Sequence, residues 1–269
     1  MSTQGSTPNA HRFDPVEATI RGREVHLEPS PRWVRVRFGG KTIVDSKHVL
    51  LLIESGRLPT YFFPLADIDP ACLEPADKAA RAPAIGRLLY WDIRVEGSTA
   101  EAAAYGPADP PAELERLKDH LTVKWSLMDE LLEEDEPVYV HPRNPYTRVD
   151  VVPSSRRVRI ELDGVTVAAS DHPWLLFETG LPTRYYFKKE DVRMDILTPT
   201  DTHTRCPYKG EASYWSVTAN ETTHPDLAWG YPDPIPECPK LKGLLAFYNE
   251  KVDTFVDGVL EERPQTPWS

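Results

Sequence analysis

Apolar and basic residues alternate from Trp33 to Phe38, which is the pattern of a strand with one buried face. The glycine pair Gly39-Gly40 follows, and residues 41–44 are again mainly apolar. Two strand-like stretches around a glycine turn predict a β-hairpin. Residues 157–168 repeat this succession with an Asp163-Gly164 turn, so a second hairpin of the same kind is expected.

Further short apolar and aromatic stretches predict more strands, because they are four to eight residues long and bounded by turn-forming residues. They lie at residues 49–54, 60–63 and 88–95 in the first half of the chain and at 175–178, 184–187 and 212–217 in the second.

Each half closes with apolar residues spaced three and four apart, which predicts one amphipathic helix per half. The apolar positions are Leu114, Leu117, Leu121, Trp125, Met128 and Leu132 in the first half, and Leu241, Leu244, Leu245, Tyr248, Val252, Phe255 and Val256 in the second.

The two halves match each other when the chain is shifted by 124 residues, without gaps over nearly the whole length. Val34-Arg35 falls on Val158-Arg159, and the register holds to the end, where Leu117-Lys118 falls on Leu241-Lys242. Such self-similarity indicates a tandem duplication. We expect a disordered tail at 1–15, a first repeat at 16–136, a second repeat at 137–262 and a tail at 263–269, with a linker near 133–141.

These patterns predict a mainly β protein (β+α). We expect two tandem small antiparallel domains, each an open β-barrel or a bent sheet with a C-terminal helix against it. The two repeats are expected to pack against each other within a monomer, as a fused homodimer would.

The composition narrows the class of protein. A formal charge of −11 argues against a nucleic-acid partner, because phosphate backbones select basic surfaces. The polar N-terminus does not resemble a signal peptide, and no apolar stretch is long enough to cross a membrane. The three cysteines, Cys72, Cys206 and Cys238, are odd in number and far apart, which fits a reducing compartment. We therefore expect a cytoplasmic protein.

Reactive side chains gather in one stretch, residues 201–215, which reads DTHTRCPYKGEASYW. The matching first-repeat stretch, residues 77–91, keeps Asp, Arg, Pro, Gly, Tyr and Trp in register. It replaces the histidine, cysteine, tyrosine and lysine by Ala79, Ala82, Ala84 and Ile85. One repeat therefore carries candidate chemistry and the other keeps the frame.

The second repeat resembles the bacterial domain-of-unknown-function family 427, whose name also carries a nucleotidyltransferase-like label. The similarity rests on separated motifs in the right order: residues 141–146, 148–150, 154–156, 185–187, 190–192, 206–215, 229 and 231–234. The first repeat shares the frame and departs at the Cys-Pro-Tyr-Lys-Gly core. The resemblance implies a compact β-rich domain and no established activity. Neither a P-loop nor a Gly-Ser pair with spaced aspartates supports the nucleotidyltransferase label.

Cys206 is a candidate nucleophile, because Arg205 and Lys209 are cations that would favour its thiolate, and His203 is a candidate base. The alternative is a small buried residue at a strand edge. Lys209 is a candidate ligand for an anionic group, or else a solvated turn lysine. Gly210 recurs as Gly86, so it is expected to serve a backbone conformation with positive φ.

A pair at His203 and Cys206 could also be half of a metal site, but no second Cys/His pair at ligand spacing accompanies it, so no metal and no cofactor are expected. Glu178 is the best shared candidate for an acid or base. The ligand-binding candidates are Arg205, Tyr208, Glu178, Tyr185, Trp215 and Arg148. For those shared by both repeats, ion pairing and aromatic packing within the frame are the simpler interpretation.

Three functions remain open from the sequence. The first is a small-molecule enzyme or binding protein with one site, in the second repeat around Cys206, Lys209 and His203, acting on a small polar or anionic ligand. The second is a non-catalytic ligand-binding module. The third is a protein-interaction scaffold that uses the degenerate first repeat. Whether the protein is an enzyme stays undecided at this point.

Overall fold

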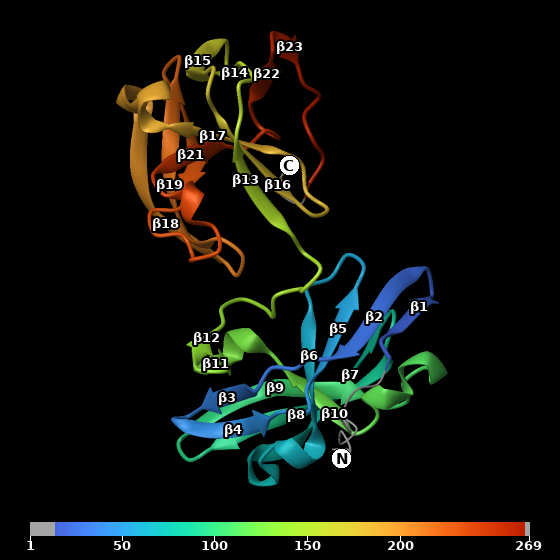
Figure 1. Ribbon diagram of the computed structural model, residues 1–269. Helices are drawn as coiled ribbons and strands as arrows, with labels where there is room; N and C mark the ends of the chain where they lie inside the picture. The colour runs from blue at the N-terminus through green and yellow to red at the C-terminus, as the bar shows by residue number, and fades with distance from the viewer. Residues whose placement is uncertain (1–13, 267–269) are drawn as a thin grey trace, which may run out of the picture. The chain divides into compact units, whose positions relative to one another are not determined.

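The computed structural model describes residues 14–266 of the chain, so most of the expected N-terminal tail and the last three residues lie outside the described part. The chain divides into two compact units, Met1–Asn144 and Pro145–Ser269 (Figure 1). Part of the expected linker is strand instead, because Glu133 ends a strand of the first unit and its side chain is buried.

The first domain consists of two antiparallel sheets. The larger sheet has eight strands in the order β1 (Val16–Ile20), β2 (Arg23–Pro29), β5 (Leu50–Glu54), β6 (Thr60–Pro64), β10 (His120–Val123), β9 (Ser98–Pro107), β8 (Gly86–Val95) and β7 (Leu73–Ala82). The smaller sheet has the order β12 (Glu136–Pro137), β11 (Glu130–Glu133), β3 (Val34–Phe38) and β4 (Lys41–Ser46).

The second domain has the same topology. Its larger sheet has the order β13 (Val149–Pro153), β16 (Trp174–Glu178), β17 (Arg184–Lys188), β21 (Leu244–Phe247), β20 (Thr222–Gly230), β19 (Gly210–Ala219) and β18 (Leu197–Cys206). Its smaller sheet has the order β15 (Val165–Ser170), β14 (Val158–Leu162), β22 (Asp253–Val256) and β23 (Val259–Leu260). Within the described residues, only β1 lacks a counterpart.

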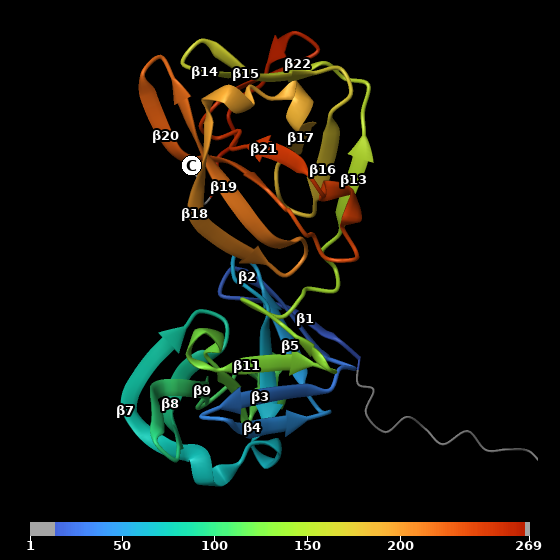
Figure 2. The ribbon, with the colours of Figure 1, turned by 90° about the vertical axis from the view of Figure 1, so that its left-hand side faces the viewer.

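In each domain the small sheet lies across one face of the curved larger sheet (Figures 1 and 2). Even the irregularities of pairing recur at the offset of 124 residues. The β7–β8 ladder shifts register between Pro75 and Ala79, and the β18–β19 ladder shifts between Pro199 and His203. Bulges mark positions where a strand bends, so the duplication extends to the curvature of the sheets.

The predicted hairpins are confirmed. Asp163 and Gly164 have φ values of 50° and 78°, and Gly39 and Gly40 have 57° and 74°. Both turn residues are left-handed, as a two-residue hairpin between twisted strands requires. The prediction of a mainly β protein is also confirmed. A barrel is not observed, because the strand order of each large sheet ends in two different edge strands, β1 and β7 or β13 and β18.

The predicted C-terminal helices are wrong. The first-repeat stretch forms the 3₁₀ turn η3 (Ala112–Leu117), strand β10, the 3₁₀ turn η4 (Trp125–Leu127) and strand β11. The second-repeat stretch forms η7 (Pro239–Leu241), β21 and β22. The other helical segments are also short 3₁₀ turns: η1 (Leu65–Asp67), η2 (Pro70–Cys72), η5 (Lys189–Asp191) and η6 (Met194–Ile196). None of the helices described is long and apolar enough to cross a membrane.

The helical spacing misled because a 3₁₀ turn also places residues three apart on one side. In η3 this buries Leu114 and Leu117. The chain then reverses at Asp119, whose φ is 57°, and Gly243 takes the matching conformation in the second repeat with φ 78°. A helix cannot continue through such a residue, and the next apolar residues alternate along a strand.

Each domain has two hydrophobic cores. One lies between the two sheets and includes Phe63 and Ile93 in the first domain and Phe187 and Val217 in the second. The other lies on the opposite face of the larger sheet, beneath η3 in the first domain and η7 in the second. Central strand β17 is buried on both faces, so Arg184, Tyr185, Tyr186 and Phe187 are all buried.

Candidate functional site

The tip of the β18–β19 hairpin carries Lys209 and Gly210, the glycine that both repeats share. Cys206 pairs with Gly210 at the end of the ladder, and the amide of Lys209 donates to the carbonyl of Cys206 at 3.3 Å. Gly210 has a φ of 108°, which confirms the positive φ predicted for it. The amide of Ile235 donates to the carbonyl of Lys209 at 3.1 Å, so the loop that follows β20 holds the tip in place.

Lys209 forms a buried ion pair with Glu178. Its Nζ donates to Oε2 of Glu178, and the two side chains are 11% and 9% exposed. Glu178 ends β16 whereas Lys209 lies in the hairpin turn, so only the folded sheet brings the two charges together. The interpretation of Lys209 as a solvated turn lysine is therefore excluded. A buried ion pair is expensive to desolvate and is weak evidence for stability by itself.

Cys206 lies beside this pair and packs, partly buried, against the second core of the domain. Tyr186, Tyr231 and Cys238 line the same cluster. Burial raises the pKa of Tyr231 well above its ordinary value, and the neighbouring Tyr186 and Cys206 add to the effect. Burial likewise raises the pKa of Cys238, which the cation of Lys209 partly offsets. The cluster is therefore poorly solvated, and the hydroxyl of Tyr231 and the thiol of Cys238 stay protonated at neutral pH.

Aromatic side chains close the cluster on the far side of Tyr186. The indole N–H of Trp229 donates to the hydroxyl of Tyr186 at 3.2 Å, and the two rings meet edge to face. Tyr248 packs on Trp229 with ring centroids 4.4 Å apart. The hydroxyls of Thr204 and Tyr214 are 2.7 Å apart. Tyr and Trp are suited to such a site because each has a large apolar ring and a polar group that needs a partner.

A second buried ion pair borders the aromatic side chains. Arg184 donates two parallel hydrogen bonds to Glu250, at 2.7 and 2.6 Å, and its guanidinium lies 5.7 Å from the ring centroid of Trp229. Burial alone would raise the pKa of Glu250, but the hydrogen bonds from Arg184 and Thr266 outweigh it and lower the pKa to about 2. This carboxylate is therefore permanently ionised at neutral pH.

His203 is not brought to Cys206. It pairs with Ser213 across the β18–β19 ladder and lies three residues from Cys206 on the same strand, so the two side chains point to opposite faces of the sheet. His203 is exposed, with Nδ1 3.8 Å from Oε1 of Glu211. It lines a cavity of about 290 Å³ together with Ser213 and Trp215, and Tyr214 and Tyr231 of the cluster also border this cavity. The geometry does not make His203 the base of a Cys206 nucleophile.

Three other sequence candidates, Arg205, Trp215 and Tyr185, make their contacts away from the Lys209–Glu178 pair. Arg205 donates to Glu211 at 2.8 Å on the same exposed face as His203. Trp215 packs against the core between the sheets. The hydroxyl of Tyr185 donates to Glu261 at 2.9 Å from that same core.

Arg148 and Tyr208 differ from each other in exposure. The Nε of Arg148 lies 2.8 Å from Oδ2 of Asp150, and its side chain is 79% exposed. Tyr208 is half-buried in the hairpin turn, next to Lys209. Of the nine candidates, the structure therefore gathers Cys206, Lys209 and Glu178, with Tyr208 adjacent in the chain.

The arrangement offers no metal centre among the described residues. Within residues 14–266, no three His, Cys, Asp or Glu side chains gather closely enough to hold an ion. His203 and Cys206, the only motif with ligand spacing, lie on opposite faces of the strand.

Several residues of the cluster were missed by the sequence reasoning, above all Tyr186, Arg184 and Glu250. Their signal is a joint substitution between the repeats. At the offset of 124 residues, Arg184, Tyr186, Cys206, Lys209, Trp229, Tyr231, Cys238 and Glu250 correspond to Thr60, Phe62, Ala82, Ile85, Tyr105, Pro107, Leu114 and Ser126. Glu178 and Tyr214 keep their residue types in the first repeat, as Glu54 and Tyr90, whereas Thr204 is replaced by Ala80.

Glu178 keeps its counterpart, Glu54, but the partner differs. Glu54 Oε1 lies 3.2 Å from Nε of Arg23 and 3.8 Å from Nε of Arg57. The matching second-repeat residues are Thr147 and Leu181, which carry no charge. Each repeat therefore neutralises the carboxylate at this position with a cation from a different position of the chain.

The comparison with protein families agrees with the duplicated fold. The family described as Domain of unknown function (DUF427) matches twice, over residues 26–134 and 150–258, which again differ by 124 residues. No curated protein matches the chain. The two matches span most of both domains, including the β18–β19 hairpin and its first-repeat counterpart. The chain therefore belongs to the family described as Domain of unknown function (DUF427), present here as two tandem copies.

Proposed function

We propose that the protein binds a small polar molecule in the second repeat, at the cluster formed by Lys209, Glu178 and Cys206. One observation carries the proposal. The second repeat buries two ion pairs and several phenols where the first repeat builds the same sheet with mainly apolar or small residues. Buried charge is costly, and the first repeat forms the same sheet with a single buried carboxylate here, Glu54, and without the charges of Lys209, Arg184 and Glu250. Buried polar and titratable side chains gathered at one point are typical of a functional site.

The cluster suits a ligand that both donates and accepts hydrogen bonds. Lys209 supplies donors and Glu178 supplies acceptors, while Tyr186 and Tyr231 supply hydroxyls from the aromatic wall. A ligand inserted beside the ion pair would replace part of the Lys209–Glu178 contact with its own polar groups. In a catalytic version of this proposal, the same two residues act as general acid and general base on the bound molecule.

Cys206 gives a direct test, because it is the partly exposed cysteine of the cluster whereas Cys72 and Cys238 are buried. The experiment is alkylation of the native protein by iodoacetamide, read by peptide mass spectrometry. Small carboxylic acids, amines, amino acids and sugar phosphates are then screened for protection of Cys206. We expect protecting compounds whose effect is lost in Lys209→Met. A Cys206 that stays unmodified until the protein unfolds would show that the cluster is closed to small solutes, and would refute the proposal.

Binding without catalysis is the second candidate. The absence of His203 from the face of Cys206 favours it over a thiol nucleophile assisted by histidine. A Cys206→Ser variant separates the two versions once a protecting compound is known. Equal affinity in the variant, with no change of the compound over time in either protein, supports a non-catalytic binding module.

A further inference from the structure

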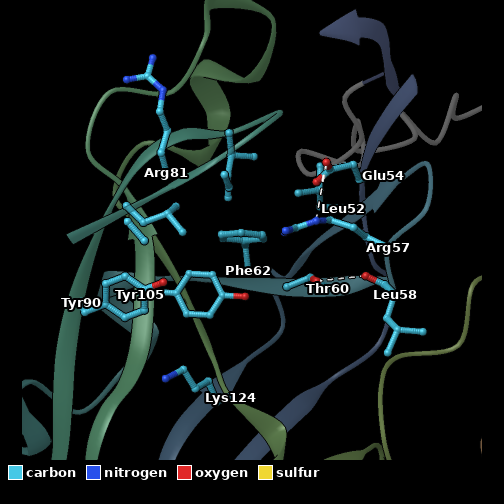
Figure 3. Close-up of a pocket in the computed structure, with 14 residues that line it drawn as sticks. Leu52, Glu54, Arg57, Leu58, Thr60, Phe62, Arg81, Tyr90, Tyr105 and Lys124 are labelled. Carbon is cyan, nitrogen blue, oxygen red and sulfur yellow. Dashed lines mark hydrogen bonds and ion pairs between the residues drawn. The ribbon is translucent and has the colours of Figure 1, made fainter. Parts of the chain in front are cut away.

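The first repeat contains a cavity of about 340 Å³ at the place that matches the second-repeat cluster (Figure 3). Phe62 lies in the middle of its lining, with Tyr105 and Tyr90 to one side. Arg57 points its guanidinium toward the centre, whereas Arg81 points away from the other side chains. The rings of Tyr90 and Tyr105 are in contact, with centroids 5.4 Å apart.

The cavity has space because four of its lining side chains are smaller than those at the matching positions of the second repeat. Position by position, Arg184, Tyr186, Cys206 and Trp229 are replaced by the smaller Thr60, Phe62, Ala82 and Tyr105, all four of which line the cavity. The repeat that lost the reactive residues has therefore gained space bounded by aromatic rings. A concave aromatic site with a few polar groups is the usual form of a small-molecule pocket.

The cavity also carries positive charge that no acid balances. Lys124 lines it, and in residues 14–266 neither Lys124 nor the nearby Lys78 forms an ion pair. Their Nζ atoms lie 5.6 and 4.9 Å from the ring centroid of Tyr90. Burial, and then the repulsion from Lys78, lower the pKa of Lys124. An anion beside Lys124 would relieve this repulsion.

The single acid in the lining is already neutralised. Glu54 is buried and lies against both Arg23 and Arg57, so it adds no free negative charge. The lining therefore carries a neutralised carboxylate at the arginine end and the ammonium group of Lys124 at the other end.

We propose that the first repeat binds a small aromatic anion in this cavity, with the anionic group at Lys124 and the ring system against Phe62, Tyr90 and Tyr105. Ring stacking supplies the contact area, and the ammonium group of Lys124 selects the charged ligand. The proposal concerns a different domain from the Lys209–Glu178 cluster and does not depend on it.

Two fluorescent probes test the proposal with the full-length protein. One is 8-anilinonaphthalene-1-sulfonate, an aromatic anion, and the other is N-phenyl-1-naphthylamine, which has the same ring system without the sulfonate. We expect Lys124→Gln to weaken binding of the anion about tenfold, because a hydrogen bond to a charged group is lost, and to leave the neutral probe nearly unaffected. Ala82→Leu should weaken both probes, since it fills the cavity beside Phe62.

Lys118→Gln is the matched control, because Lys118 is an exposed lysine of the same domain outside the lining. It should change neither affinity. The proposal is overturned if the anionic probe does not bind the wild-type protein, or if it binds Lys124→Gln as tightly as wild type. Equal weakening of both probes by Lys124→Gln would also overturn it, since the lysine would then act on packing and not on charge. Lys124→Gln changes a half-buried residue without altering volume greatly, so it keeps the test valid even if Ala82→Leu folds poorly.

Discussion

Ile85 of the first repeat and Lys209 of the second occupy matching positions in the turn between two long strands. Both are buried, with 4% and 8% of the whole residue exposed. One sheet topology thus accommodates either an apolar side chain or an ammonium group at the same point. The ammonium group is accommodated because Glu178 accepts its hydrogen bond. In the first repeat, Arg23 forms the ion pair with Glu54, whose carboxylate matches that of Glu178.

Lys209→Ile should destabilise the second domain by about 3 kcal/mol, because it leaves Glu178 buried without its cation. Adding Thr147→Arg, which copies Arg23 of the first repeat, should restore much of the loss. Hydrogen exchange of peptides from β16 and β17, read by mass spectrometry, measures the effect on this domain. Lys242→Ile is the control, since Lys242 is an exposed lysine. A double variant no more stable than Lys209→Ile would contradict the relocation of the counter-charge.

The Arg184–Glu250 pair should make the second domain sensitive to acid. The pKa of Glu250 is lowered from 4.5 to about 2 in the folded protein. A lowered pKa gives stability that is complete above pH 4.5 and is lost as the pH falls toward 2. Thermal unfolding between pH 2 and 7 should therefore show wild type well above Glu250→Gln at pH 6, with the gap narrowing below pH 4.5. Glu190→Gln, at an exposed ion pair, should follow wild type throughout. A constant gap across the range would argue against this titration.

The three cysteines should separate clearly in alkylation of the native protein. Cys206 is partly exposed, whereas Cys72 and Cys238 are buried and burial raises the pKa of both thiols. A buried thiol with a raised pKa presents little thiolate at neutral pH and reacts slowly. We expect Cys206 alone to be modified at pH 7.5, with the other two reacting only in denaturant. Modification of Cys238 at the rate of Cys206 would contradict this ranking and would mean that the loop between β20 and η7 opens readily.

Gly230→Ala should destabilise the second domain by more than 2 kcal/mol. A Cβ at this position would lie 2.5 Å from the carbonyl oxygen of Leu244, which is part of the adjacent strand and cannot move away easily. Gly106 has the same constraint in the first repeat. Gly164→Ala is the comparison: it has no neighbour within 4 Å, and only its positive φ is strained, which costs about 1 kcal/mol. Denaturant titration of the two variants should rank them in that order, and an equal loss would refute the steric explanation.

Local sequence patterns were sufficient to predict the two hairpins and the positive φ of Gly210. Alternation along residues 33–38 and the Asp163-Gly164 pair predicted strands and turns correctly, because both depend on backbone preferences of neighbouring residues. The prediction of a C-terminal helix in each repeat was wrong because residues three apart also lie on one side of a 3₁₀ turn. Gly243 was the local sign that the apolar run is interrupted.

The candidate site was only partly predictable. The sequence pointed to Lys209 and Cys206 through their loss in the first repeat, but it placed His203 with them. Strand alternation separates His203 from Cys206, and this was decided by the pairing register of β18 with β19.

The sequence by itself determined the duplication, since the offset of 124 residues is carried by matching residues throughout. Only the tertiary structure decided which side chains meet. Arg184 and Glu250 are far apart in the chain, and so are Lys209 and Glu178, because sheet pairing brings distant strands together. It also decided that the first repeat holds a cavity, since empty space depends on the combined volumes of Thr60, Phe62, Ala82 and Tyr105 around one point.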